Sequence, residues 1–130
     1  MDKKIEALIK TEGDQASFDY RGIECEIRRH PSLGHLCGYI HLPADSPLVG
    51  MDTDEIEASY QFPAHGGLTW SRYRIEDGTQ VIGFDCAHVG DLSPYSLYLA
   101  GEYRDMKYVT RCLMLMVDYY LDEVVPNAIK

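Results

Sequence analysis

The residues best suited to chemistry lie between His65 and Asp91. This stretch holds the turn His65-Gly66-Gly67, the only tryptophan of the chain, Trp70, and the segment Gly83-Phe84-Asp85-Cys86-Ala87-His88-Val89-Gly90-Asp91. Imidazole, thiol and carboxylate groups can bind metals, transfer protons or hydrogen-bond a ligand, and glycines let two backbones approach closely. This concentration predicts a functional site, although no known catalytic or cofactor motif accompanies it.

A metal site would draw on two histidines and two aspartates of this stretch, namely His65, Asp85, His88 and Asp91. Zinc suits histidine ligands, and an aspartate ligand with one open position would suit a metal-dependent hydrolase. No pair of these residues has the spacing of a structural zinc site, however, and Asp85 and His88 on a straight strand end would point in opposite directions. We therefore expect no cofactor, with zinc as the alternative.

Nucleophilic catalysis is a second alternative. It would need a nucleophile, a histidine base and an orienting aspartate, which here would be Cys86 or Ser71, His65 or His88, and Asp85 or Asp91. The sequence contains no nucleophile elbow, and a cysteine in an apolar strand is commonly a small buried hydrophobe. Binding without turnover is therefore the favoured interpretation.

A pocket for a small ligand is the hypothesis that uses most of these residues. Trp70 or Tyr60 could stack on a base, and Arg72 or Arg74 could bind phosphates through paired hydrogen bonds. Glycine-rich turns could offer backbone N–H groups to an anion. The predicted ligand-binding residues are His65, Gly66, Gly67, Thr69, Trp70, Arg72, Asp85, His88 and Asp91.

The net charge of −9 limits the class of partner. A protein that binds nucleic acid by neutralising phosphates needs clustered Lys and Arg, so direct nucleic-acid binding is not expected. The same charge counts against a phosphate ligand unless the pocket is locally positive. An acidic surface could instead bind a basic protein by imitating nucleic acid.

The pattern of apolar residues predicts the elements that position this stretch. Alternation of apolar and polar residues predicts strands over 17–20, 23–29, 35–42, 67–75 and 79–86. Helical spacing predicts a short helix over 2–12, one or two turns over 52–59, and a long helix over 104–125 that Pro126 would end. Asp77-Gly78 predicts a hairpin whose open end gathers the site residues. The expected fold is one α+β domain over residues 1–130, with an antiparallel sheet of five or six strands packed by the long C-terminal helix and the short N-terminal helix.

Other features of the sequence indicate where the protein is located and how it could assemble. No apolar run approaches the roughly 18 residues of a membrane span, and no signal sequence opens the chain, so we expect a soluble, cytoplasmic protein without membrane contact. The four cysteines are widely spaced without a CxxC pair, which favours reduced thiols. The many tyrosines of the C-terminal third are typical of interfaces and could mark a homo-oligomer contact.

Five segments are the basis of a resemblance to a known family. They are Tyr20-Arg21-Gly22 with Cys25, Leu36-Cys37-Gly38-Tyr39, His65-Gly66-Gly67-Leu68-Thr69, the segment from Gly83 to Asp91, and Tyr103-Arg104-Asp105. Together they resemble a family of small proteins of unknown function encoded by bacteriophages and prophages. The resemblance implies a phage accessory protein, and proteins of this kind often counter host defence by occupying a defence protein or by sequestering a nucleotide signal.

The predicted function is therefore that of a phage accessory protein for host-defence evasion. It would act by sequestering a nucleotide-like small molecule in a pocket at the open end of the central hairpin, in the host cytoplasm. One alternative is an inhibitor that binds a host defence protein through its acidic surface, as an anti-CRISPR-like nucleic-acid mimic. The other alternative is the metal-dependent hydrolase described above.

Overall fold

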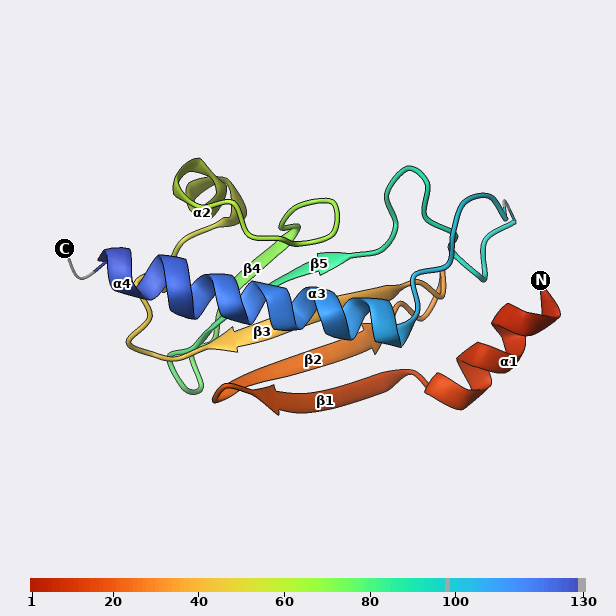
Figure 1. Ribbon diagram of the computed structural model, residues 1–130, viewed down its shortest axis with the longest axis horizontal. Coiled ribbons are helices and arrows are strands. Elements are labelled where there is room, and N and C mark those ends of the chain that lie inside the picture. Colours follow the sequence, from red (N-terminus) through yellow and green to blue (C-terminus); the bar gives the residue numbers. More distant parts are fainter. Residues whose placement is uncertain (98, 129–130) are drawn as a thin grey trace.

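The computed structural model describes residues 1–97 and 99–128 and contains a five-stranded antiparallel sheet with a long helix on one face (Figure 1). The strands are β1 (Gln15–Tyr20), β2 (Ile23–Arg29), β3 (Leu36–Leu42), β4 (Trp70–Tyr73) and β5 (Gln80–Asp85), in the order β1-β2-β3-β5-β4. The helices are α1 (Lys3–Glu12), α2 (Thr53–Ser59), α3 (Met106–Tyr119), the π-helical segment η1 (Tyr120–Val124) and α4 (Val125–Ala128). The predicted α+β class, with its short N-terminal and long C-terminal helices, is confirmed.

The alternation seen in the sequence gives the sheet one apolar face. In β2, Ile23, Cys25 and Ile27 are buried, whereas Glu24 and Arg28 are exposed. Because successive side chains of a strand point to opposite faces, the buried set faces α3 and the polar set faces away from it. The face that points away from α3 is called the outer face below.

One β-hairpin lies at each edge of the sheet. The turn between β1 and β2 has positive φ at both Arg21 (52°) and Gly22 (85°), as a type I′ turn requires. The predicted hairpin around Asp77-Gly78 is also confirmed, since β4 pairs antiparallel with β5. Both of its strands are shorter than predicted, although Thr69 still donates to the Gly83 carbonyl and Arg74 to the Thr79 carbonyl beyond the ends of β4.

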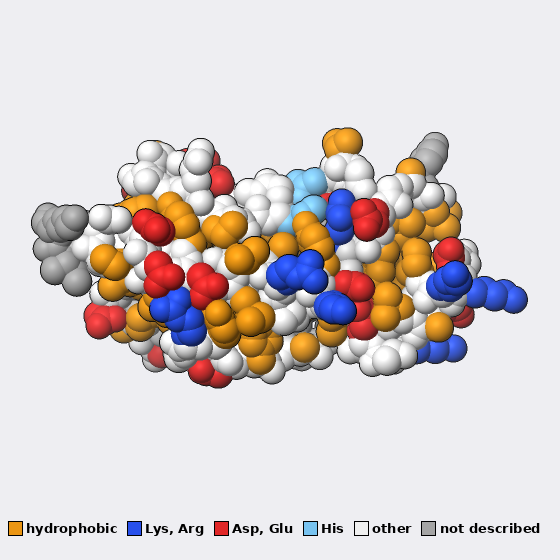
Figure 2. Space-filling view, viewed as in Figure 1, with side chains coloured by type: hydrophobic (Ala, Val, Ile, Leu, Met, Phe, Trp, Pro, Cys, Tyr) orange, Lys and Arg blue, Asp and Glu red, His pale blue; other side chains and the backbone are white. Residues whose placement is uncertain are grey.

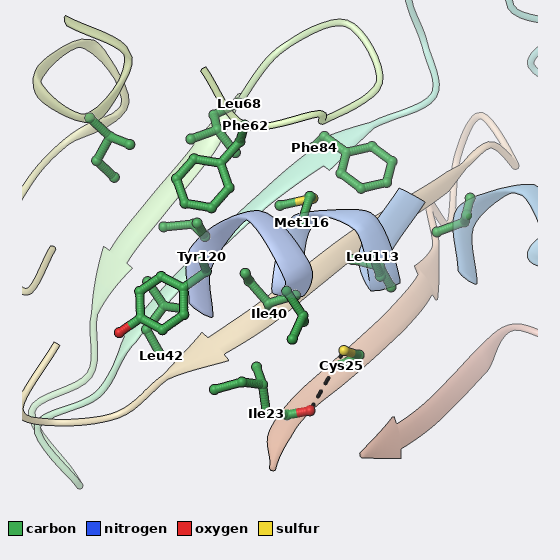
Figure 3. Close-up of a cluster of buried hydrophobic side chains, with 14 of the residues drawn as sticks. Ile23, Cys25, Ile40, Leu42, Phe62, Leu68, Phe84, Leu113, Met116 and Tyr120 are labelled. Atoms are coloured by element: carbon green, nitrogen blue, oxygen red, sulfur yellow. Dashed lines mark hydrogen bonds between the residues drawn. The ribbon is translucent and has the colours of Figure 1, made fainter. Parts of the chain in front are cut away.

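The core lies between the sheet and α3 (Figure 3). Leu113 and Met116 of α3 are fully buried against Ile40 of β3 and Phe84 of β5, and Tyr120 continues the same face into η1. Burying an aliphatic or aromatic side chain of this size contributes roughly 1.5–3 kcal/mol. The packing of α3 therefore supplies much of the stability and fixes the position of the helix on the sheet.

The last helix continues past the proline that was expected to end it, which corrects the prediction. The N–H of Val125 donates to the carbonyl of Tyr120, five residues earlier, and the helix then runs through Pro126 to Ala128. A π-helical turn contains one extra residue, and proline is tolerated in the first turn of a helical segment because it needs no N–H donor there. Within the described residues, no helix has the length and apolar character needed to cross a membrane.

A buried arginine ties α1 to the beginning of α3. The side chain of Arg29 is 2% exposed and donates to the Tyr103 hydroxyl at 2.8 Å and to Glu12 at 3.4 Å. The second carboxylate oxygen of Glu12 accepts from the backbone N–H of Met106 at 2.7 Å, in the first turn of α3. A buried charge is tolerated only when it is paired and hydrogen-bonded, and this network meets that condition.

Candidate functional site

The predicted site residues separate into two groups, one on the α3 side of the sheet and one on its outer face, which meet where His88 approaches Asp85. His65, His88 and Asp91 lie on the α3 side, the face on which Figure 2 shows histidine next to Lys and Arg side chains. The residues of the outer face and its end are Thr69, Trp70, Arg72 and Asp85. The two glycines of the turn belong to neither group as ligands, since the Gly67 N–H donates to the Ala64 carbonyl and Gly66 makes room for the His88 ring.

On the α3 side, Asp91 is the centre of a hydrogen-bonded network. Its side chain is 1% exposed, and its Oδ2 lies 2.7 Å from His65 Nε2 and accepts from the His88 backbone N–H at 3.0 Å. Its Oδ1 accepts from Arg104 Nε at 2.9 Å. Burial alone would raise the pKa of Asp91, but the hydrogen bonds from His65, His88 and Arg104 outweigh it and hold the pKa below its ordinary value.

Both nitrogens of His65 are engaged in this network. The carboxylate of Asp91 accepts a hydrogen bond from the Nε2–H of His65, which in the neutral ring leaves Nδ1 as the acceptor for the Tyr108 hydroxyl at 2.7 Å. The guanidinium of Arg104 lies 5.1 Å from the centre of the Tyr108 ring. His65 could therefore bind a metal only by losing one of these bonds. In the part of the chain that the structure describes, no group of three or more His, Cys, Asp or Glu side chains is arranged to hold a metal ion.

Asp85 and His88 approach each other, which corrects the expectation that they would point in opposite directions. His88 Nε2 lies 3.3 Å from Asp85 Oδ1, because the chain bends after β5 and the Ala87 N–H donates to the same oxygen at 3.0 Å. The geometry at His88 Nε2 does not make a hydrogen bond, and this buried nitrogen has no hydrogen-bond partner within residues 1–97 and 99–128. Gly66, with a φ of 73°, lies against the His88 ring, where a Cβ would overlap it.

The two candidate nucleophiles do not face the histidines. Ser71 donates its hydroxyl to the Met51 carbonyl at 2.6 Å. Cys86 is buried in the core, and this burial raises the pKa of its thiol. All four cysteines are free thiols. The structure therefore gives the nucleophilic alternative no support.

Burial predicts that Cys86 and Cys25 are unreactive in the folded protein. Burial raises the pKa of Cys25 to about 11, and the thiolate is the reactive form of cysteine. Iodoacetamide at pH 8 is expected to leave both residues unmodified in native protein, as measured by mass spectrometry of peptides. In urea the same residues should alkylate fully. Rapid native labelling of Cys86 would contradict its placement in the core.

On the outer face, two aromatic rings meet above a glycine. Strand pairing places Tyr39 of β3 and Trp70 of β4 on either side of Gly83 of β5. The two ring centroids are 6.4 Å apart with an interplanar angle of 81°, and Trp70 is 45% exposed. A Cβ on Gly83 would meet the Tyr39 ring at 2.6 Å. The absent side chain thus allows Tyr39 to lie over the backbone beside Trp70.

A groove of about 380 Å³ borders this aromatic pair on the outer face. It is called the arginine groove, and its charged and titratable residues are Glu26, Arg28, His41, Arg72, Arg74 and Glu76. Arg28 pairs with Glu26 at 2.6 Å, and Arg74 lies 3.5 Å from Glu76. Within the described residues, Arg72 has no ion-pair partner. Arg74 also lies 3.8 Å from Asp77, so Arg72 is the positive charge of the groove that no carboxylate of the described residues offsets.

The sequence did not connect several residues of this face with Trp70. Tyr39, His41 and Arg28 come from β2 and β3, and only the strand order brings them beside β4 and β5. The available signal was the alternation of side chains within each strand, which places these residues on the same face of the sheet. Tyr60, the other residue considered for stacking, packs against the hydrophobic core instead. Comparison of the chain with protein-family models, with curated proteins and with solved structures gave no match.

Proposed function

We propose that the protein binds and sequesters a nucleotide-like small molecule on the outer face of its sheet. The observation that carries this proposal is the pair formed by the exposed Trp70 and the partly buried Tyr39 beside the arginine groove. Aromatic side chains stack on nucleobases, with roughly 1–3 kcal/mol gained per base. Guanidinium groups bind phosphate oxygens through paired hydrogen bonds. The two features together suit a ligand that has a flat ring and a phosphate.

The size and charge of the groove support a small anionic ligand. Its volume of about 380 Å³ lies within the range of roughly 300–1,000 Å³ that is usual for small-molecule sites. The net charge of −9 would repel a phosphate from most of the surface, whereas the groove carries an excess of arginine over glutamate. Arg72 is exposed and unpaired among the described residues, so it can bind a phosphate without giving up an ion pair.

The resemblance to proteins of bacteriophages and prophages supplies a biological role for this binding. In this proposal the protein acts in the cytoplasm of an infected host as a counter-defence factor. By holding a nucleotide signal of the host defence, it would lower the free concentration of that signal. The ligand would be stored and not converted.

A filtration experiment with a pool of linear and cyclic nucleotides tests the proposal. Purified protein is expected to retain at least one nucleotide, which chromatography should recover unchanged after heat release. Trp70→Ala removes the stacking surface and should weaken binding roughly 5- to 100-fold. Arg72→Ala removes the unpaired cation and should weaken it about tenfold, because a charge-assisted hydrogen bond contributes roughly 1.5–3 kcal/mol. Titration calorimetry measures both losses.

Arg111→Ala is the matched control for Arg72→Ala. Arg111 is also an exposed cation, but it lies on α3 at the other side of the sheet. Its removal changes the net charge equally and should leave the affinity unchanged. An equal loss in both variants would show that general charge, and not the groove, attracts the ligand. The proposal would be overturned if every nucleotide of the pool passed through the filter unchanged, or if a retained nucleotide were recovered as a different compound.

A further inference from the structure

The outer face continues past the aromatic pair into a second hollow of about 420 Å³. This space is called the histidine hollow, and it is lined by His30, His35 and Asp85 together with the same Tyr39 and Trp70 that border the arginine groove. The two spaces therefore lie on either side of one aromatic pair. A ligand stacked on these rings could extend into both.

A histidine that lines this hollow has a buried nitrogen without a partner among the described residues. His35 is 5% exposed, and its Nδ1 makes no hydrogen bond. Its ring stacks on that of His30, with centroids 4.8 Å apart and an interplanar angle of 17°. A buried polar group without a partner costs roughly 1–3 kcal/mol, so such a group commonly has a functional reason. His35 lines the hollow, so a ligand atom there could become the partner of this buried nitrogen after a small turn of the ring.

The hollow differs from the arginine groove in its electrical character. Burial, together with the neighbouring His30, lowers the pKa of His35, so its imidazole is neutral and offers one donor and one acceptor. The carboxylate of Asp85 is half-buried and uses Oδ1 to accept from the Ala87 N–H. Its Oδ2 is left to accept from a ligand. A neutral ring and a carboxylate suit the edge of a heterocycle and repel a phosphate.

We propose that the arginine groove and the histidine hollow form one site that takes a nucleotide in a single orientation. The phosphate lies in the groove, the base stacks on Trp70 or Tyr39, and the base edge enters the hollow. Asp85 then selects bases with an exocyclic amino group, because an amino group donates to its carboxylate whereas a carbonyl oxygen is repelled by it. This inference rests on the proposed function and deepens it.

Two pairs of nucleotides test this selection. AMP and IMP differ in an amino against a carbonyl group on the six-membered ring, and the neighbouring ring nitrogen is an acceptor in AMP and an N–H donor in IMP. CMP and UMP differ in the same way, so the expected preference applies to a base whose exocyclic group, and not its ring N–H, faces Asp85. Titration calorimetry on the full chain is expected to give AMP and CMP about tenfold tighter binding than IMP and UMP, since an unmatched buried polar group costs about 1.4 kcal/mol or more. Ribose 5-phosphate serves as the probe without a base.

Three variants separate this inference from the proposed function. Asp85→Asn keeps the acceptor for the Ala87 N–H but puts an amide NH2 donor in place of Oδ2, so the preference for amino bases should be lost or reversed, while ribose 5-phosphate still binds. Arg72→Ala should weaken the binding of all five compounds and leave the preference for AMP and CMP unchanged. His35→Phe keeps a flat ring on His30. It should weaken the binding of the nucleotides without changing the binding of ribose 5-phosphate.

The outcomes are distinguishable. Nucleotides that bind through Trp70 and Arg72 with equal affinity for amino and carbonyl bases would overturn the inference and leave the proposed function standing. The inference would also be overturned if the wild-type protein preferred carbonyl bases, or if Asp85→Asn left the preference of the wild-type protein unchanged. If none of the five compounds binds, both the inference and the nucleotide ligand of the proposed function are wrong.

Discussion

Asp91→Ala is expected to lower the free energy of unfolding by about 3 kcal/mol, because it leaves the donors of a largely buried hydrogen-bond network without their acceptor. Asp91 is almost completely buried and accepts hydrogen bonds from His65, Arg104 and the His88 backbone. Without it, three donors lose their acceptor. Urea denaturation followed by circular dichroism measures the change.

Glu102→Ala is the matched control for Asp91→Ala. Glu102 also binds Arg104, at 3.1 Å, but its side chain is 75% exposed. Ion pairs at the surface contribute roughly 0–1 kcal/mol, so this variant should be close to the wild-type protein in stability. Equal effects of the two substitutions would show that the buried network contributes no more than a surface pair.

The contribution of Asp91 should depend on pH in a defined direction. Its pKa is lower in the folded protein than the unfolded value of about 3.9. A group with a lowered pKa stabilises the fold fully above the unfolded pKa, and this stabilisation disappears as the pH falls through the folded pKa. The difference between wild type and Asp91→Ala should therefore be constant above about pH 5 and shrink below about pH 4.

Gly83→Ala is expected to destabilise the protein by roughly 1–3 kcal/mol and to abolish ligand binding on the outer face. A Cβ at this position would meet the Tyr39 ring at 2.6 Å and would also overlap the carbonyl oxygen of Gly38. The backbone oxygen cannot move without disturbing the pairing of β3 with β5. Tyr39 must therefore leave its place beside Trp70. Thermal unfolding and calorimetry measure the two effects.

Gly22→Ala separates steric overlap from the general cost of replacing a glycine. A Cβ there has open space around it, and the cost comes only from its φ of 85°, roughly 1–2 kcal/mol for an L-residue in this region. Because the turn between β1 and β2 is remote from Trp70 in the strand order, ligand binding should persist. If Gly83→Ala binds as well as Gly22→Ala, the position of the Tyr39 ring does not matter.

Local patterns in the sequence predicted the elements well, and the reason is physical. Alternation in β2, the Asp77-Gly78 turn and the apolar spacing of α3 are properties of neighbouring residues, and neighbouring residues decide strand, turn and helix. The end of the last helix was predicted wrongly, because η1 changes the hydrogen-bond partner of Val125 before Pro126 is reached. Such a π-helical turn has no simple local signal.

The arrangement of the site was less predictable, because it depends on contacts between distant residues. The sequence grouped His65 with Trp70, which are close in the chain, whereas the fold places them on opposite sides of the sheet. It gave no sign that Tyr108 would contact His65, since this contact comes from the packing of α3. Nor did it show that β3 would lie next to β5 and bring Tyr39 beside Trp70.

The position of α3 in the chain also has a consequence for how the protein is made. All five strands are synthesised before α3, yet their apolar face, including Ile40 and Phe84, is covered by that helix (Figure 1). The contact between Glu12 and Met106 likewise joins α1 to a segment that is synthesised after all five strands. The sheet therefore cannot bury its apolar face until α3 has been made, and until then the growing chain exposes an apolar surface that is prone to aggregate.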